Sequence, residues 1–543
     1  MSFTGIVHQD TDGTFWFDDE AVRKPDQIPR RAAWSGTTWY TTSAVSMAGL
    51  INLMGPEDQA FGPKPERPLG VHFRWEDGGG KMRGFKVLSS SLWDVRSRDP
   101  RETEDLLSYS MMLCANDGVM PKMSAAGTAI GRYMSTYDGR DGRPSSVQLP
   151  PRWRGLAHAS FHGGPILLTQ GSARECIHID MRAAYLDAMS QPLPVWGEIE
   201  GKKVGGWYTI EGAPWSEIRD KVGFVEAEVT VDPKLGRELG IPPLPVRMGF
   251  CSAFPCGTFW GSWPIQMVRE AEDRGEVVIN KVRQWCFAPI TMPLFKEIAT
   301  DFAGCRKGKL LYTRFWGKWA SKGGFLGQRT DEPPTGTVRS HGIWWGFDGV
   351  DAYTHQAPAT YRPDLAALIA GYNHMQVLAA VRTLKPGSVI ALHVDAIWTT
   401  DIEGGRRLVA AHKDRWISKQ EGPGRFYGPG VYHHASRIAA SGYDEAALGP
   451  LTPYNLEAWA NSPLNRDHRG TMQSRVWTDA PARDPAARSE PVELAPGQTT
   501  PPVGGPSVND TCWTLRGWLR KEIREALEQG PHGLPPDLPP STA

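Results

Sequence analysis

The chain has 543 residues, with 60 Lys plus Arg and 60 Asp plus Glu, so its formal net charge is zero. The length predicts roughly two to four domains rather than one compact core. The neutral charge excludes a wholly basic nucleic-acid binder but not a local basic groove. The first residues lack a signal pattern and no apolar run is long enough to span a membrane, so we expect a soluble, cytoplasmic protein without membrane contact.

Residues 1–155 predict a small α+β domain. Short alternating apolar runs at 71–73 and 85–87 are typical of strands, and the stretch near 103–135 favours a helix. A polar, proline-bearing segment at 143–151 then marks a boundary. Residues 156–445 have the composition of a folded core.

Two segments of this core present acids at the ends of strands. Residues 175–180 (ECIHID) predict a strand that ends at Asp180, and residues 388–400 (SVIALHVDAIWTT) predict a hairpin with Asp395 at its tip. Between them, residues 361–384 predict a helix with Pro363 in its first turn and Leu365, Leu368 and Tyr372 on one face. Strand, helix and hairpin together predict a layered α+β unit.

The C-terminal part has a different composition. Residues 446–477 predict a small additional element, and residues 478–508, rich in Pro, Ala, Thr and Gly, predict a flexible linker. Residues 509–530 predict a helix with Asp510 and Thr511 at its start. We expect this helix to be tethered, and to dock on a partner, on DNA or back on the chain itself.

Asp180 and Asp395 have two possible roles. Carboxylates from strands far apart in sequence can hold Mg²⁺, a hard cation that shares its ligand shell with substrate phosphates. Two such ions can stabilise the attacking and the leaving oxygen of an in-line displacement. An Asp that follows a strand is, however, most often a turn residue.

Five segments, taken in chain order, carry a resemblance to a known family. Residues 161–164 (FHGG) resemble Y-x-G-G, residues 178–185 (HIDMRAAY) resemble motif A (D-x-x-S-L-Y-P), and residues 309–318 (KLLYTRFWGK) resemble motif B (K-L-x-x-N-S-x-Y-G-K). Residues 393–396 (HVDA) stand in the place of motif C (D-T-D-S), and residues 430–432 (GVY) in that of K-x-Y. The chain therefore resembles the family B DNA polymerases, especially their protein-primed branch in phages and mobile elements, over roughly residues 103–445.

This resemblance implies a multidomain α+β fold, the right hand of a family B-like polymerase. Residues 1–155 would be a degenerate exonuclease-like domain, and residues 156–445 the palm with short fingers at about 290–325. Residues 446–477 would be a remnant of the thumb.

The resemblance also implies roles for individual residues. Asp180 and Asp395 would be the catalytic, metal-binding pair, holding two Mg²⁺ or Mn²⁺ ions, with His393 as a possible further ligand. Tyr185 would lie under the incoming sugar, and Lys309 and Arg306 would bind its triphosphate. Template contacts would come from Phe161, Gly163, Gly164 and Tyr432. The expected partners are DNA, as primer-template or single strand, dNTPs, and a priming or replication protein at the C-terminal helix.

Several positions depart from the family pattern. His393 replaces the first Asp of motif C, Gly430 replaces the K-x-Y lysine, and Thr313 and Arg314 replace the Asn-Ser of motif B. We expect the neighbouring Asp residues to raise the pKa of His393, and Mn²⁺ to be used better than Mg²⁺.

Residues 1–155 contain no complete set of exonuclease acids. Asp18 begins the only D-x-E match that we consider there, so we expect no proofreading. The expected function is DNA-directed DNA polymerase, a nucleotidyltransferase. The alternatives are an inactive relative that binds nucleic acid or a replication partner, and a template-independent nucleotidyltransferase.

Overall fold

The computed structural model describes residues 3–10, 12–23, 37–42, 44–53, 59–62, 69–76, 82–95, 99–140, 143, 145–169, 171–199, 202–210, 212–248, 251–320, 323–328, 338–340, 343–349, 360–428, 430–440, 450–460 and 475–477. The chain divides into two compact units. The first combines Met1–Ser145 with Phe295–Arg362, and the second combines Ser146–Leu294 with Pro363–Ala543.

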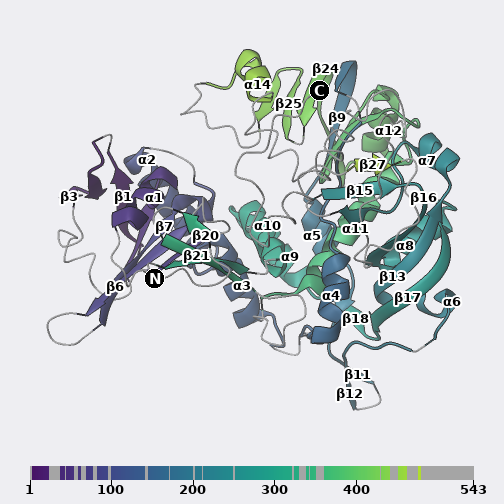
Figure 1. Cartoon of the computed structure of the whole chain (residues 1–543), viewed down its shortest axis with the longest axis horizontal. Coiled ribbons are helices and arrows are strands. Elements are labelled where there is room, and N and C mark those ends of the chain that lie inside the picture. Colours follow the sequence, from purple (N-terminus) through teal and green to yellow (C-terminus); the bar gives the residue numbers. More distant parts are fainter. Residues whose placement is uncertain are drawn as a thin grey trace. The chain divides into compact units, whose positions relative to one another are not determined.

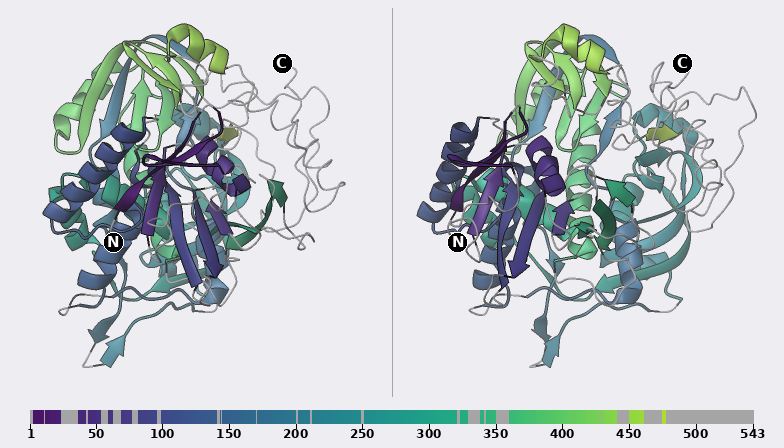
Figure 2. Two further views of the ribbon diagram at one scale, coloured as in Figure 1. Left: turned by 90° about the vertical axis from the view of Figure 1, so that its left-hand side faces the viewer. Right: turned by 60° about the vertical axis from the view of Figure 1, so that its left-hand side comes forward.

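A mixed sheet forms the first unit. Its strands run in the order β20-β21-β19-β5-β6-β7-β4-β1-β2-β3. β4 is parallel to both β1 and β7, and the other neighbours are antiparallel. The purple strands of this sheet lie side by side in Figure 2. The strands are β1 (Phe3–Gln9), β2 (Phe15–Phe17), β3 (Glu20–Val22), β4 (Thr37–Thr41), β5 (Gln59–Gly62), β6 (Gly70–Glu76), β7 (Met82–Ser89), β19 (Gly323–Gln328), β20 (Val338–Ser340) and β21 (Ile343–Gly349).

Apolar side chains hold a helix against this sheet. Phe17 meets Trp39 and Phe85 edge to face, and residues of the helix α1, among them Leu50 and Ile51, belong to the same core. The Asp99 carboxylate accepts hydrogen bonds from two backbone N–H groups at the start of α2, which stabilises that end of the helix. The helical elements of this unit are α1 (Ala44–Leu53), η2 (Ser90–Trp93), α2 (Pro100–Asn116), α3 (Ala125–Thr136), α9 (Lys296–Gly304) and α10 (Gly308–Trp319).

The segment expected to form the fingers, about 290–325, supplies α9 and α10 to this first unit. Tyr133 of α3 lies 5.1 Å, ring centre to ring centre, from Phe295, 5.5 Å from Phe315 and 6.0 Å from Trp319. These edge-to-face contacts bury large aromatic surfaces and fix the two helices against α3.

The described strands of the second unit include a seven-stranded sheet with the order β26-β25-β24-β9-β23-β22-β8. β9, β24 and β25 are seen side by side in Figure 1. Side chains of Ile177, Ile179 and Met181 enter the large core on one face, and Cys176 enters a second cluster with Trp398. The strands are β8 (Ile166–Leu168), β9 (Ser172–Met181), β22 (Val389–His393), β23 (Ala396–Thr399), β24 (Trp416–Gly428), β25 (Val431–His434) and β26 (Arg437–Ala440).

The helix α11 (Pro363–Val381) is buried along most of its length, and it contributes Val377, Leu378 and Val381 to the large core. The same core takes side chains from a second sheet, in the order β16-β13-β17. These three strands are β13 (Val222–Val231), β16 (Gly257–Pro264) and β17 (Val278–Ala288). The remaining elements are α4 (Pro151–Ala159), α5 (Ala184–Met189), α6 (Trp215–Ile218), α7 (Pro233–Leu239), α8 (Ile265–Asp273), α12 (Ile402–Ala411), α14 (Pro453–Ala460), β10 (Leu193–Pro194), β11 (Gly197–Ile199), β12 (Lys202–Val204), β14 (Val246–Met248), β15 (Cys251–Pro255), β18 (Thr291–Met292) and β27 (Arg475–Trp477).

Two expectations lie outside the described residues, namely the linker at 478–508 and the C-terminal helix at 509–530. Of the expected thumb remnant at 446–477, only 450–460 and 475–477 are described. None of the helices in the described part of the chain has the length and apolar character to cross a membrane.

Candidate active site

The strand β9 delivers Asp180 next to its end, as the sequence predicts. Because side chains alternate along a strand, Asp180 lies on the face of His178 and not on that of Ile179. His178 is buried and stacks on Trp398, with ring centres 4.2 Å apart. Asp180, nearer the strand end, is half-buried and reaches solvent.

Asp395 lies in the two-residue connection between β22 and β23, as the predicted hairpin requires. Val394 has a φ of 64°, in the left-handed region, which makes the turn tight. Ala396 is the Cα partner of Asp180, and the Met181 N–H donates to the Asp395 carbonyl at 2.9 Å. The fold therefore brings together the backbones of the two acids, from segments more than 200 residues apart in sequence.

Two hydrogen bonds and the close approach of a glycine hold this hairpin turn in place. The Val394 N–H donates to the Pro165 carbonyl at 2.7 Å, and the buried Asn373 of α11 donates through Nδ2 to the Val394 carbonyl at 3.2 Å. A Cβ atom on Gly164 would lie 2.7 Å from Val394 Cγ1. Sequence patterns did not single out Asn373, and they gave Gly164 only a template role.

Tyr185 lies in α5, directly after the acid-bearing strand. Burial raises the pKa of its phenol, and the negative charge of Asp395 raises it further. Tyr185 therefore lies within electrostatic reach of Asp395. Gln376 of α11 donates to the Asp187 carboxylate and so ties α5 to α11. Just after α5, the Pro192 carbonyl accepts from the Tyr372 hydroxyl of α11 at 2.9 Å. Figure 1 shows α5 beside α11.

His393 differs from the expectation in its electrostatics. Burial lowers the pKa of its imidazole below the ordinary value, and Asp180 opposes this shift with a weaker effect. The prediction that the neighbouring acids raise this pKa is therefore wrong, because desolvation disfavours the charged imidazolium more than the carboxylate favours it. His393 is neutral at neutral pH.

Lys419 is a residue that sequence reasoning missed. Its Nζ lies 3.2 Å from Asp180 Oδ2. Ser418 pairs with Ile179 and Gln420 with His178, so Lys419 is the extra residue of a bulge in β24. No motif marks this lysine, and only the register of the two strands brings it to Asp180.

The donor set fits a divalent metal ion that completes its ligand shell with substrate. Among the described residues, no group of three or more His, Cys, Asp or Glu side chains could enclose a metal by itself. Mg²⁺ is, however, commonly held by one or two carboxylates together with substrate phosphates and water. The ammonium group at Asp180 further indicates that this carboxylate attracts a cation.

The two basic residues expected to bind a triphosphate belong to the first unit. Lys309 is exposed in the first turn of α10. Arg306 is engaged by Asp117, whose carboxylate accepts from its Nη2 at 2.9 Å and from its Nε at 3.1 Å. These bonds lower the pKa of Asp117.

The residues expected to contact a template fall into two groups. Phe161 and Gly163 are half-buried in the connection from α4 to β8, where Gly163 has a φ of 69°. Tyr432 is buried on β25, with its ring 5.1 Å from that of Trp398, so its ring serves the packing of the sheet. Gly430, in place of the family lysine, has a φ of 65°, which glycine adopts more readily than lysine.

Asp18, the candidate acid of the N-terminal unit, has a backbone role. It lies in the turn between β2 and β3 with a φ of 54°, and its Oδ1 accepts from the Ile6 N–H at 2.8 Å. A Cβ atom on Gly5 would lie 2.3 Å from this oxygen, so the carboxylate is closely packed.

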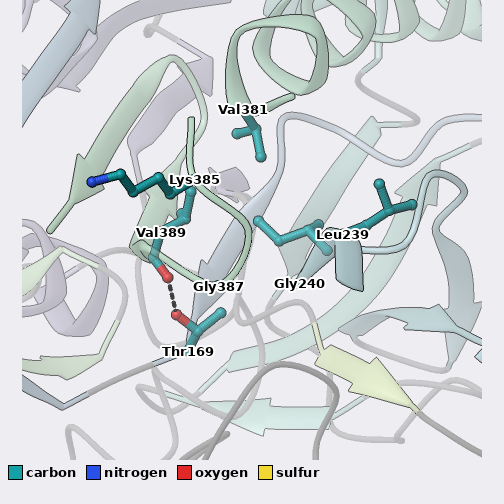
Figure 3. Close-up of a pocket in the computed structure, with 8 residues that line it drawn as sticks. Thr169, Leu239, Gly240, Val381, Lys385, Gly387 and Val389 are labelled. Atoms are coloured by element: carbon teal, nitrogen blue, oxygen red, sulfur yellow. Dashed lines mark hydrogen bonds between the residues drawn. The ribbon is translucent and has the colours of Figure 1, made fainter. Parts of the chain in front are cut away.

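A small cavity lies at the other end of β22 from the acids (Figure 3). Its volume is about 10 Å³, close to the room that one water molecule needs. The Thr169 hydroxyl on its wall donates to the Val389 carbonyl. Val389 and His393 are separated by four residue steps, or about 13 Å of strand, so this cavity is not part of the carboxylate site.

Comparison with solved structures identifies the fold. Phi29 DNA polymerase complexed with single-stranded DNA is similar with a TM-score of 0.58 and 11% identity, over 83% of this chain and 93% of that one. The chain has the fold of phi29 DNA polymerase. The ternary complex of that polymerase with primer-template DNA and incoming nucleotide substrates gives a TM-score of 0.54 and 12% identity, over 84% and 94% of the two chains. No protein-family model matches the sequence, and no curated protein does so either.

The likeness to phi29 DNA polymerase confirms the family B resemblance as a statement about fold. At 11% to 12% identity it identifies the fold alone. The assignment of Asp180, Asp395 and their neighbours to catalysis therefore depends on the chemistry of this chain.

Proposed function

We propose that the chain is a DNA-directed DNA polymerase that transfers a nucleotide from a dNTP to a primer hydroxyl, with two Mg²⁺ or Mn²⁺ ions. One observation carries the proposal. In a chain with the phi29 DNA polymerase fold, the strand end bearing Asp180 pairs with the tight hairpin that bears Asp395.

The proposed roles follow from the positions of the side chains. Asp180 and Asp395 would hold the ions, which would supply activation of the attacking hydroxyl and stabilisation of the charge on the leaving group. Tyr185, within electrostatic reach of Asp395, would lie under the incoming sugar. His393, neutral, contributes an imidazole nitrogen without adding negative charge.

Lys309 and Arg306 would bind the triphosphate. Lys309 is exposed and Arg306 has a rigid guanidinium suited to phosphate. Arg306 would have to leave Asp117 to do so. That ion pair is half-exposed, so solvent can replace the contacts that Arg306 would give up.

The remaining parts of the proposal concern partners and domains. Residues 1–155 would be an exonuclease-like domain without proofreading, consistent with the backbone role of Asp18. Phe161, Gly163, Gly164 and Tyr432 would line the path of the template. The helix at 509–530 would bind a priming or replication protein, in the cytoplasm of a cell that carries a phage or mobile element.

A second candidate function has its own support. His393 and Lys419 together make the site less negative than one with three carboxylates, which weakens metal binding. This observation favours an inactive polymerase relative that still binds nucleic acid.

A primer-extension assay separates these functions. The full chain is incubated with each dNTP, with and without template, in Mg²⁺ or Mn²⁺. Template-directed incorporation that Asp395→Asn abolishes supports the proposal. Incorporation without template indicates a terminal transferase. DNA binding without incorporation in either metal indicates the inactive relative.

A further inference from the structure

The ion pair between Lys419 and Asp180 sits at the rim of the carboxylate site. The Lys419 side chain is 39% exposed and that of Asp180 is 26% exposed. An ion pair open to water is weak and exchanges readily, because solvent screens the attraction and the long side chain gains freedom when released. The contact is therefore one that a stronger cation can displace.

The position of Lys419 in a bulge gives its side chain this freedom. The register shift between Ser418 and Gln420 removes Lys419 from the regular pairing with β9. Its ammonium group ends a flexible four-carbon stem with three rotatable donors. Lys419 can therefore move by several Å while β24 keeps its hydrogen bonds.

Among the described residues, Lys419 is the basic side chain that forms an ion pair with Asp180. Arg437 of β26 acts electrostatically on His178 and Tyr432, and in the described part of the chain it forms no ion pair with Asp180.

We propose that Lys419 is an exchangeable internal cation of the active centre, which holds the Asp180 carboxylate until a divalent ion binds there and then turns to a substrate phosphate. The inference rests on the proposed function, since it assigns Asp180 to metal binding. Lysine suits the second position because an ammonium group binds phosphate as a compact point charge. The phosphate belongs either to the incoming nucleotide or to the primer-template.

The first test measures Mn²⁺ binding to the full chain without nucleotide or DNA, by the electron paramagnetic resonance signal of free Mn²⁺. Lys419→Met removes the competing charge and should tighten Mn²⁺ binding about threefold to fivefold, as expected for the loss of a half-exposed ion pair worth up to about 1 kcal/mol. Lys419→Arg keeps the charge and should bind like wild type. Asp180→Asn should bind far more weakly.

Lys413→Met is the matched control. Lys413 is exposed in the connection from α12 to β24, and it belongs to none of the ion pairs found among the described residues. The Lys413→Met variant loses the same charge as Lys419→Met, in the same unit but without an ion pair to Asp180. It should therefore leave Mn²⁺ affinity within about twofold of wild type. Thermal melting of each variant shows that it is folded.

The second test has two arms that identify the source of the phosphate. With Ca²⁺ present to prevent turnover, the dissociation constants of a dNTP and of primer-template DNA are measured separately. Lys419→Met should weaken one of them by about tenfold or more relative to Lys413→Met, the lower end of the range for one lost charge-assisted hydrogen bond.

The outcomes separate this inference from the proposed function. If Lys419→Met leaves Mn²⁺ affinity unchanged while Asp180→Asn loses it, the exchange is wrong and metal binding at Asp180 stands. If Mn²⁺ binds more tightly but neither phosphate ligand binds more weakly, the transfer to phosphate is wrong. If Asp180→Asn binds Mn²⁺ like wild type, the proposed function fails as well.

Discussion

Gly164 and Gly163 offer a sharp test of how the Asp395 hairpin is positioned. A Cβ atom on Gly164 would lie 2.7 Å from Val394 Cγ1 and 2.9 Å from Val394 Cα. Ordinary carbon contacts are about 3.5–4.0 Å, so Val394 must move by roughly 1 Å. On Gly163 a Cβ atom would meet nothing within 4 Å, but its φ of 69° disfavours any other residue. Both changes to alanine therefore cost stability, but only one displaces the hairpin.

The magnitudes separate the two variants. Gly164→Ala should cost about 1–3 kcal/mol as overpacking, and Gly163→Ala about 1–2 kcal/mol as left-handed strain. A displacement of about 1 Å at a catalytic group can reduce the rate about 100-fold. We expect this loss in the single-turnover rate of Gly164→Ala, whereas Gly163→Ala should keep the rate and at most bind template less tightly.

The assay is rapid-quench incorporation of one nucleotide at saturating primer-template and dNTP, with urea unfolding measured in parallel. Equal rates for the two variants at equal stability would refute the claim that Gly164 sets the position of Asp395. A rate loss that template concentration reverses would instead assign Gly164 to template binding alone.

Three further outcomes are expected. Burial lowers the pKa of His178 and of His374 to about 3, so the unfolded state takes up more protons than the folded state below about pH 6.5. The free energy of unfolding should therefore fall by up to about 1.4 kcal/mol per pH unit for each histidine as the pH drops from 6.5 toward 3. Urea unfolding that gives the same free energy at pH 7 and at pH 5 would contradict this. His393→Asp should lower the melting temperature in EDTA, because it adds a second carboxylate near Asp180, and Mg²⁺ should restore it; a melting temperature indifferent to Mg²⁺ would count against a metal here. Labelled single-stranded DNA should resist 3′→5′ degradation, and degradation that Asp18→Asn removes but Asp395→Asn does not would show that proofreading exists.

Much of the carboxylate site could be predicted from the sequence because local patterns specify it. The short apolar run of residues 175–180 predicted the strand that ends near Asp180, and two apolar runs around a lone acid predicted the Asp395 hairpin. Pro363 in the first turn and a long apolar pattern predicted a helix over 361–384, and α11 spans Pro363–Val381.

What the sequence missed depends on contacts between distant segments. Lys419 reaches Asp180 only because a bulge shifts the register of β24. In the sequence, Asn373 is one more polar residue in a helix, and only the fold shows that it donates to the Val394 carbonyl in the hairpin turn. The direction of the His393 pKa shift was wrong because a sequence names neighbouring charges but not the degree of burial. Nor do local patterns indicate that α9 and α10 pack on α3.

The central claim is that Asp180 and Asp395 together hold divalent metal ions with a nucleotide. The most direct measurement is a crystal structure of the full chain with Mn²⁺ and a non-hydrolysable dNTP analogue, with anomalous scattering to locate manganese. We predict manganese between the two carboxylates, with their oxygens within about 4–6 Å of each other, as a pair of ions in such sites requires. Carboxylates more than about 10 Å apart with the analogue bound, or manganese bound only elsewhere, would contradict the account.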